Sequence, residues 1–156
     1  GFRFRADRPA SSPVSLDGFC ASGGPNEIWS YGEEAYEIMV KYVAVRERLR
    51  PYIHKQLQKA SEEGTPLMRP LFYDYPKDDV YDIYDQYMFG PDIMVCPVHE
   101  KGVGMRNVYF PKGQNFIDTA TGKEYEGGTV VNAEAPLHTI PAYLRKGTEL
   151  TCEMFR

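Results

Sequence analysis

GTPLMRPLF at residues 64–72 and DQYMFGPDIMVCPV at residues 85–98 are two apolar stretches separated by a short acidic gap. Each contains an extended run that proline or glycine closes, and both follow one long helical pattern. This order predicts a join between an α/β unit and an all-β unit. The chain therefore has the pattern of a piece of a larger protein.

The helical pattern covers residues 31–63, where apolar residues recur at steps of three or four. Acidic residues crowd its first turns, and Gly64 stands where a left-handed C-terminal residue is expected. Pro51 removes a backbone donor inside the pattern, which predicts two helices over residues 33–49 and 51–62. The apolar face must be covered, so we expect either packing on the β-unit or association between copies. This face consists of Ile38, Tyr42, Val45, Leu49, Ile53 and Leu57.

After Gly64, residues 67–73 are apolar on both faces, which favours a buried parallel strand that follows its helix. A helix that feeds such a strand is half of an α/β-barrel repeat. Residues 74–84 form an acidic connector, for which we expect one helical turn capped by aspartate.

Short extended runs separated by glycine- and proline-containing turns fill the rest of the chain and predict an antiparallel sandwich. The expected domains are residues 1–84, which include the helices and the first strand, and residues 85–156, the β-sandwich. The predicted strands of the second domain are residues 86–88, 93–98, 107–110, 115–118, 129–132 and 142–146.

Composition narrows the classes of partner. The net charge of −4 comes from 18 basic and 22 acidic residues with no basic stripe, which argues against nucleic acids and membrane surfaces. No apolar run approaches the roughly 20 residues that span a bilayer, and no signal peptide follows Gly1, so we expect a soluble protein. Three widely spaced cysteines suggest reduced thiols rather than disulfides or zinc, which favours a cytoplasmic setting.

Several motifs in fixed order resemble glycoside hydrolase family 31, which contains α-glucosidases and α-xylosidases. The resemblance covers residues 2–147 and rests on FRFRADR at 2–8, PNEIWSYG at 25–32, RERLRPYI at 46–53, MRPLF at 68–72, DQYMFG at 85–90, VCPV at 95–98, VYFPKG at 108–113 and IPAYLRKG at 140–147.

This resemblance implies a retaining α-glycosidase with a (β/α)8 catalytic barrel followed by β-sandwich domains. The expected fold is then an α+β fragment, formed by the last helix and strand of the barrel and an antiparallel β-sandwich. In the family, both catalytic aspartates lie upstream of this segment. Retaining hydrolysis needs two carboxyl groups about 5 to 5.5 Å apart, so the isolated segment is expected to be inactive. The implied partners are an oligosaccharide or glycoside substrate and the remaining barrel of the same chain, with no cofactor and no metal.

The resemblance also implies substrate-binding residues near the N-terminus. The family pattern Phe-Arg-x-His-Gly aligns with residues 2–6, which places Arg3 at the arginine and Arg5 at the histidine. Arginine there adds charge and bulk, so either the register is shifted or the pocket differs from the usual one. Trp29 is a further candidate for stacking on a sugar, although a tryptophan at this place more commonly anchors the start of a barrel helix.

Several other charged or polar residues are predicted to have structural roles. Arg69, inside an apolar run, needs a carboxylate partner if it is buried. Asp85 and Gln86 match a family element at the junction of barrel and sandwich. Asp78 and Asp79 are adjacent and are therefore more typical of a capped turn than of a catalytic pair.

A second function class stays open at this point. The chain can also be a non-catalytic β-sandwich module whose many aromatic residues bind carbohydrate, because aromatic content suits sugar-binding clefts as well as β-rich cores.

Overall fold

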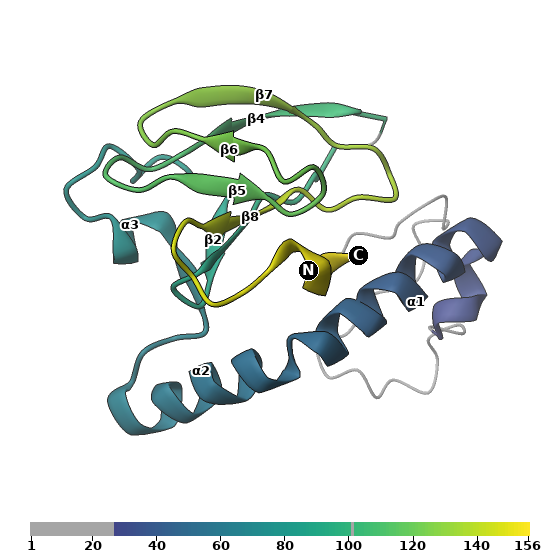
Figure 1. The fold of residues 1–156 in the computed structure, drawn as a ribbon. Helices are drawn as coiled ribbons and strands as arrows, with labels where there is room; N and C mark the ends of the chain where they lie inside the picture. The colour runs from purple at the N-terminus through teal and green to yellow at the C-terminus, as the bar shows by residue number, and fades with distance from the viewer. Residues whose placement is uncertain (1–26, 101) are drawn as a thin grey trace, which may run out of the picture. The chain divides into compact units, whose positions relative to one another are not determined.

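The computed structural model describes residues 27–100 and 102–156, so Arg3 and Arg5 lie outside the described residues. The chain divides into two compact units, Gly1–Val43 and Ala44–Arg156. The first unit contains the 3-10 turn η1 (Ile28–Tyr31) and most of helix α1 (Glu33–Arg48). The second contains helix α2 (Arg50–Glu63), all the strands and the terminal 3-10 turn η2 (Cys152–Phe155) (Figure 1).

The helical segment is divided at Leu49, as the position of Pro51 predicted. Proline is tolerated in the first turn of α2 because the amide groups there have no partner within the helix. At the other end, Gly64 adopts the left-handed conformation with φ of 72°, and its amide donates to the Ala60 carbonyl. Both helix boundaries were therefore predictable from single residues.

The second unit is built on two antiparallel sheets. One has six strands in the order β1-β2-β3-β8-β5-β6, and the other pairs β4 with β7 above it (Figure 1). The strands are β1 (Met68–Pro70), β2 (Tyr87–Phe89), β3 (Ile93–Val95), β4 (Met105–Tyr109), β5 (Phe116–Asp118), β6 (Glu124–Tyr125), β7 (Val130–Glu134) and β8 (Ala142–Arg145). The predicted antiparallel β-unit is confirmed.

The core of this unit lies between the two sheets. Val108 of β4 and Ala133 of β7 belong to the same buried cluster as strand residues of the larger sheet. Phe110, fully buried, is at the centre: its ring stacks on Tyr125 at 4.9 Å and meets the edge of Tyr143 at 4.9 Å. Such aromatic pairs add to the energy of apolar burial, so these three rings hold the layers together.

One sequence expectation about the first strand is wrong. The run at residues 67–73 does not form a buried parallel strand: β1 is three residues long, pairs antiparallel with β2, and gives way to the helical turn α3 (Leu71–Asp74). Phe72 and Tyr73 are exposed. An apolar run does not reveal the direction of its partner, and Pro70, which has no amide hydrogen, ends the strand. The connector at residues 74–84 also differs from the expected helical turn: only Asp74, the end of α3, is helical, and residues 75–84 form turns, bends and irregular chain.

Gln86 joins the two sheets at the start of β2. Its side-chain amide donates to the Tyr109 carbonyl and accepts from the Tyr109 amide, both at 2.9 Å. The buried Gln86 side chain thus pairs both backbone groups of the last residue of β4, as a neighbouring strand would do. Next to it, buried Arg106 pairs with Asp85 at 2.7 Å and donates to the Asp85 carbonyl at 3.1 Å. These contacts agree with the structural role predicted for Asp85 and Gln86.

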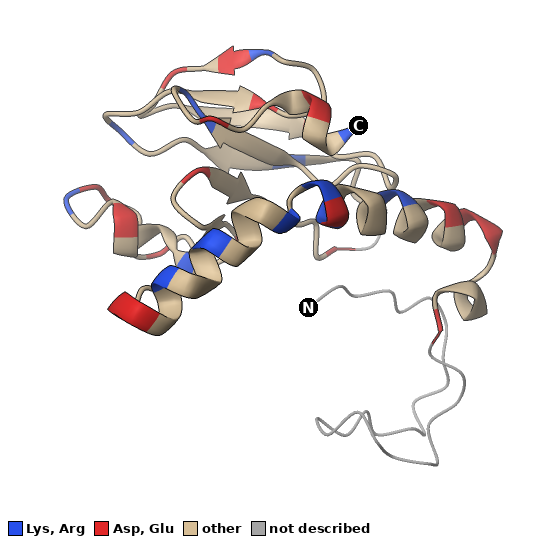
Figure 2. Cartoon of the chain, turned by 60° about the horizontal axis from the view of Figure 1, so that its bottom comes forward, with Lys and Arg blue, Asp and Glu red and all other residues tan. Residues whose placement is uncertain are grey.

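Charged side chains of both signs are interspersed over the described chain (Figure 2). Glu33 and Glu34 lie in the first turn of α1, and Arg46 and Arg48 lie in its last turn, where they complement the helix dipole. Among the described residues, no helix combines the length and apolar character that crossing a membrane requires.

Replacing Gln86 by Met tests its bridging role. Gln86→Met keeps a side chain of similar length but leaves the Tyr109 amide and carbonyl without partners, so we expect a loss of about 2–3 kcal/mol of unfolding free energy. Urea unfolding followed by circular dichroism measures it, with Gln58→Met on the exposed side of α2 as control. Equal midpoints for the two variants would contradict the bridging role.

Candidate functional site

The structure places one of the three predicted site residues. Trp29 lies in η1 and is 68% exposed, so its ring is open to solvent in this chain. Arg3 and Arg5 lie outside the described residues, and their predicted roles stay predictions. The described residues contain no group of three or more His, Cys, Asp or Glu side chains that could hold a metal ion.

Two hydrogen bonds of Tyr52 connect α2 to the β2–β3 turn, and we call this contact the Tyr52 joint. The Tyr52 hydroxyl donates to the Phe89 carbonyl at 3.0 Å and accepts from the Asp92 amide at 3.3 Å. Burial raises the pKa of Tyr52, and the nearby Asp92 carboxylate raises it further, so the hydroxyl remains protonated and can donate.

Gly90 makes this joint possible. It has φ of +63°, and a Cβ atom built on it would lie 2.0 Å from the Tyr52 hydroxyl oxygen. Its amide also donates to the Leu67 carbonyl at 2.7 Å, which extends the pairing of β1 with β2. Glycine is therefore required here both for backbone conformation and for space.

Arg69 has the carboxylate partner that its position predicted. It is 7% exposed, and its Nε lies 2.8 Å from Oδ2 of Asp74, the last residue of α3. The guanidinium also lies over the Tyr73 ring, 5.2 Å from its centroid. Burial raises the pKa of Asp74 in spite of the charge of Arg69. These contacts make Arg69 part of the fold, where it fixes the chain as β1 passes into α3.

Asp78 ties the connector to the end of β4. Its Oδ2 accepts from the Tyr109 hydroxyl at 2.6 Å and from the Lys112 amide at 2.9 Å, and its Oδ1 accepts from the Asp79 amide at 2.9 Å. Burial alone would raise the pKa of Asp78, but these hydrogen bonds outweigh it and lower the pKa to about 2. A carboxylate so fully bonded is structural, as the sequence suggested for this acidic pair.

Residues 64–150, more than half of the chain, match the family model "Glycosyl hydrolase family 31 C-terminal domain". The chain belongs to glycosyl hydrolase family 31. The region matched runs from the end of α2 through β8 and so includes both sheets.

Two curated family 31 relatives are similar over most of this chain. Alpha-glucosidase 2 of Bacillus thermoamyloliquefaciens is 35% identical over 84% of the chain, and an alpha-xylosidase of Saccharolobus solfataricus is 37% identical over 81%. The chain spans only 17% of the length of each of these enzymes.

A solved family 31 structure has the same fold. The alpha-xylosidase from a soil metagenome, crystallised with xylose, is 44% identical with a TM-score of 0.78, and the match covers 92% of this chain and 21% of that enzyme. The likeness thus extends to the arrangement of the strands, at an identity that also supports common descent.

Sequence reasoning did not assign roles to the two residues that form the joint. Tyr52 and Gly90 were each part of a family 31 motif, but the motifs lie far apart in the chain, and no spacing rule brings them together. The signal that could have indicated the contact is the glycine itself, because the turn between β2 and β3 requires a positive φ.

Acid titration tests the role of Asp78. Its folded-state pKa of about 2 is below the ordinary 3.8, so the ionised form stabilises the fold. That contribution is complete above about pH 4 and is lost as the pH falls toward 2. We expect Asp78→Asn to be less stable than the original protein at neutral pH, and the difference to shrink between about pH 4 and 2. Urea midpoints across this range measure it, and a constant difference would refute the role.

Steric overlap at the joint is tested by a mutant cycle. Gly90→Ala should cost about 2–4 kcal/mol, because an alanine must adopt positive φ and also displace the Tyr52 ring. Gly122→Ala is the matched control: Gly122 has φ of +75° with nothing within 4 Å, so only the backbone cost remains.

The second half of the cycle places Gly90→Ala in a Tyr52→Phe background. Removing the hydroxyl relieves the closest contact, so the penalty of Gly90→Ala should become smaller there. Urea unfolding gives all four free energies. If Gly90→Ala costs no more than Gly122→Ala, or the same in both backgrounds, the joint is not constrained as described.

Proposed function

We propose that this chain is the C-terminal part of a retaining α-glycosidase that hydrolyses terminal α-linked glucose or xylose from oligosaccharides. The observation that carries the proposal is the family 31 match over residues 64–150, together with relatives that are α-glucosidases and α-xylosidases and are about five times as long. In this proposal the two catalytic aspartates belong to the upstream part of the enzyme, and this segment alone is inactive.

The proposed reaction proceeds by double displacement. One carboxylate attacks the anomeric carbon while the other carboxyl group protonates the leaving oxygen, and water then releases the covalent sugar with retention of configuration. Arg3 and Arg5, and less directly Trp29, would bind the sugar in the innermost subsite.

The described residues have a supporting task in this proposal. The helices form the last helical segment of the (β/α)8 barrel, within a barrel part that extends to residue 84, and the sandwich stabilises the barrel end. The Tyr52 joint supports this role, because it fixes α2 to the β2–β3 turn through a half-buried hydroxyl. A rigid attachment keeps catalytic groups elsewhere in the protein in register.

A non-catalytic carbohydrate-binding module is the second candidate. Exposed aromatic rings on the connector favour it: Tyr84 is 94% exposed, and Tyr81, 64% exposed, stacks on Phe72 with ring centroids 5.3 Å apart. Open aromatic faces of this kind can bind sugars without catalysis.

Assay of the parent protein separates the two candidates. The open reading frame that contains this segment, expressed in full, should hydrolyse p-nitrophenyl α-xyloside or α-glucoside, and NMR should show the α anomer as the first product. The segment alone, at equal concentration, should release no nitrophenol. A parent without activity on either glycoside, in a preparation with cooperative unfolding, would favour the binding module.

A further inference from the structure

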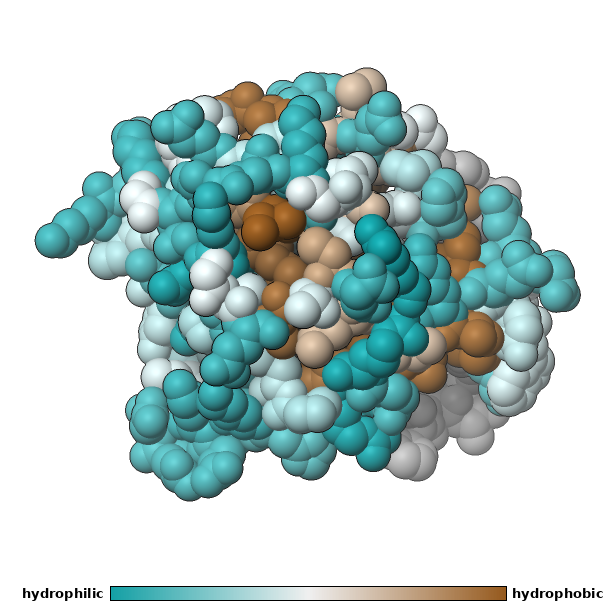
Figure 3. Space-filling model, in the orientation of Figure 1, coloured by the Kyte–Doolittle hydropathy of each residue, from teal (hydrophilic) through white to brown (hydrophobic). Residues whose placement is uncertain are grey.

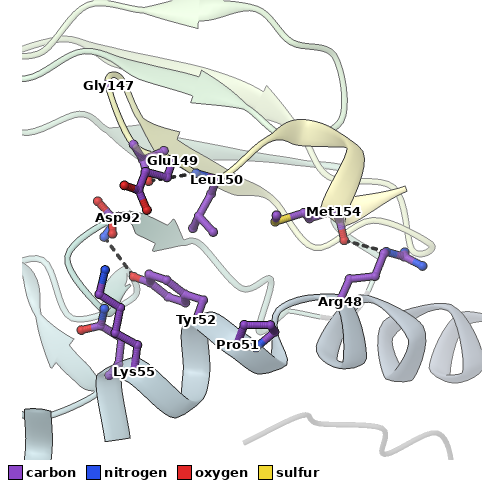
Figure 4. A pocket seen from close by; sticks show the side chains of 11 residues that line it. Arg48, Pro51, Tyr52, Lys55, Asp92, Gly147, Glu149, Leu150 and Met154 are labelled. Atoms are coloured by element: carbon purple, nitrogen blue, oxygen red, sulfur yellow. Dashed lines mark hydrogen bonds between the residues drawn. The ribbon is translucent and has the colours of Figure 1, made fainter. Parts of the chain in front are cut away.

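A groove of about 440 Å³ runs along α2, on the side where the segment after β8 passes. Its walls come from α2, from the β2–β3 turn at Asp92, and from residues 147–154 (Figure 4). All of these lie within the unit Ala44–Arg156. Arg48, the last residue of α1, donates to the Met154 carbonyl at 3.0 Å and so fixes the far wall beside the start of α2. The volume is that of a small-molecule site.

Gln56 lines this groove with a polar group that has no partner. Its side chain is 7% exposed, yet its amide makes no hydrogen bond within the described part of the chain. The Gln56 amide atoms are not sealed from solvent, so water or a ligand can reach them. An amide of this kind offers both a donor and an acceptor to a ligand in the groove.

Charges of both signs face the same space without neutralising each other. Lys55 lies one residue before Gln56 on α2, and Glu149 lies on the opposite wall. Neither forms an ion pair in the part of the chain that the structure describes. Asp92 adds a second carboxylate beside the Tyr52 hydroxyl. With Arg48, the groove thus presents two cations, two anions and an amide, a set that matches hydroxyl groups better than it matches any single charge.

Apolar side chains complete the lining. Pro51, Leu150 and Met154 border the groove. In the space-filling view, apolar residues gather in the middle of the face drawn, with hydrophilic residues around them (Figure 3). A pyranose ring has this same division, with C–H groups on its faces and hydroxyl groups at its rim.

We propose that the groove along α2 binds a neutral oligosaccharide, with the sugar hydroxyls on Lys55, Gln56 and Glu149 and the C–H face on Leu150 and Met154. Neutrality follows from the balanced charges of the lining. The choice of α-linked glucose or xylose as the sugar rests on the proposed function, whereas the presence of a saccharide site does not.

The test is binding of maltotriose and isoprimeverose to the 156-residue chain itself, followed by ¹⁵N–¹H NMR. We expect millimolar binding of at least one of them, with shifts concentrated at residues 52–56, 92 and 147–154. Lys55→Met, Gln56→Leu and Glu149→Gln should each weaken binding about fivefold, the effect of losing one hydrogen bond of about 1 kcal/mol.

Matched controls make the same chemical changes outside the groove. Lys59→Met lies one turn further along α2, and Glu134→Gln lies on β7, so both should bind like the unmodified chain. Circular dichroism confirms that each variant is folded. Shifts centred on other residues, equal losses in the controls, or no binding of either sugar would overturn the proposal. Activity of the parent enzyme is a separate readout, so failure here and failure of the proposed function are distinguishable.

Discussion

The second unit depends on the Tyr52 hydroxyl reaching the backbone of the β2–β3 turn. That half-buried hydroxyl is the donor to the Phe89 carbonyl and the acceptor from the Asp92 amide, so it serves both as donor and as acceptor. The turn and the helix constrain each other's sequence. The turn needs a glycine so that the Tyr52 ring can approach it, and the helix needs its tyrosine at the position directly after Pro51. Pro51, Tyr52 and Gly90 therefore act together as one structural element, although 37 residues separate the ends of the Tyr52–Phe89 bond.

Elsewhere in this unit, buried polar side chains form hydrogen bonds with backbone groups that a neighbouring strand would pair in a larger sheet. The short strands leave backbone groups at their ends without neighbours, and these groups must be paired inside the protein. Gln86 pairs both groups of Tyr109, Arg106 bonds the Asp85 carbonyl, and Asp78 takes the Lys112 amide. Each contact links segments far apart in sequence. The sandwich is accordingly specified by a few side-chain to backbone bonds as much as by its aromatic core.

The sequence predicted elements well wherever a local rule applied. Pro51 and Gly64 marked helix ends through backbone chemistry, and glycine turns separated strands that the structure places within two or three residues of the expected bounds. The sequence did not predict features that depend on which other strand a segment pairs with. Residues 67–73 were assigned to a parallel strand because an apolar run carries no information on strand direction, which the pairing of Arg69 with Met88 decides. The carboxylate partner of Arg69 was predictable from burial, but its identity as Asp74 was not.

The groove and the joint are two consequences of the same geometry. Tyr52 holds α2 against the sheet at one point, and the next turn of the helix carries Lys55 and Gln56 past the edge of that contact. The segment after β8 has no regular structure until η2, so nothing in the hydrophobic pattern of residues 147–154 indicated that it returns along α2. Arg48, at the end of α1, binds this segment at Met154 and so fixes the position of the segment beside the helices. A joint between helix and turn beside an irregular return of the chain thus produces a groove lined by polar and apolar side chains, and such a lining is typical of ligand sites.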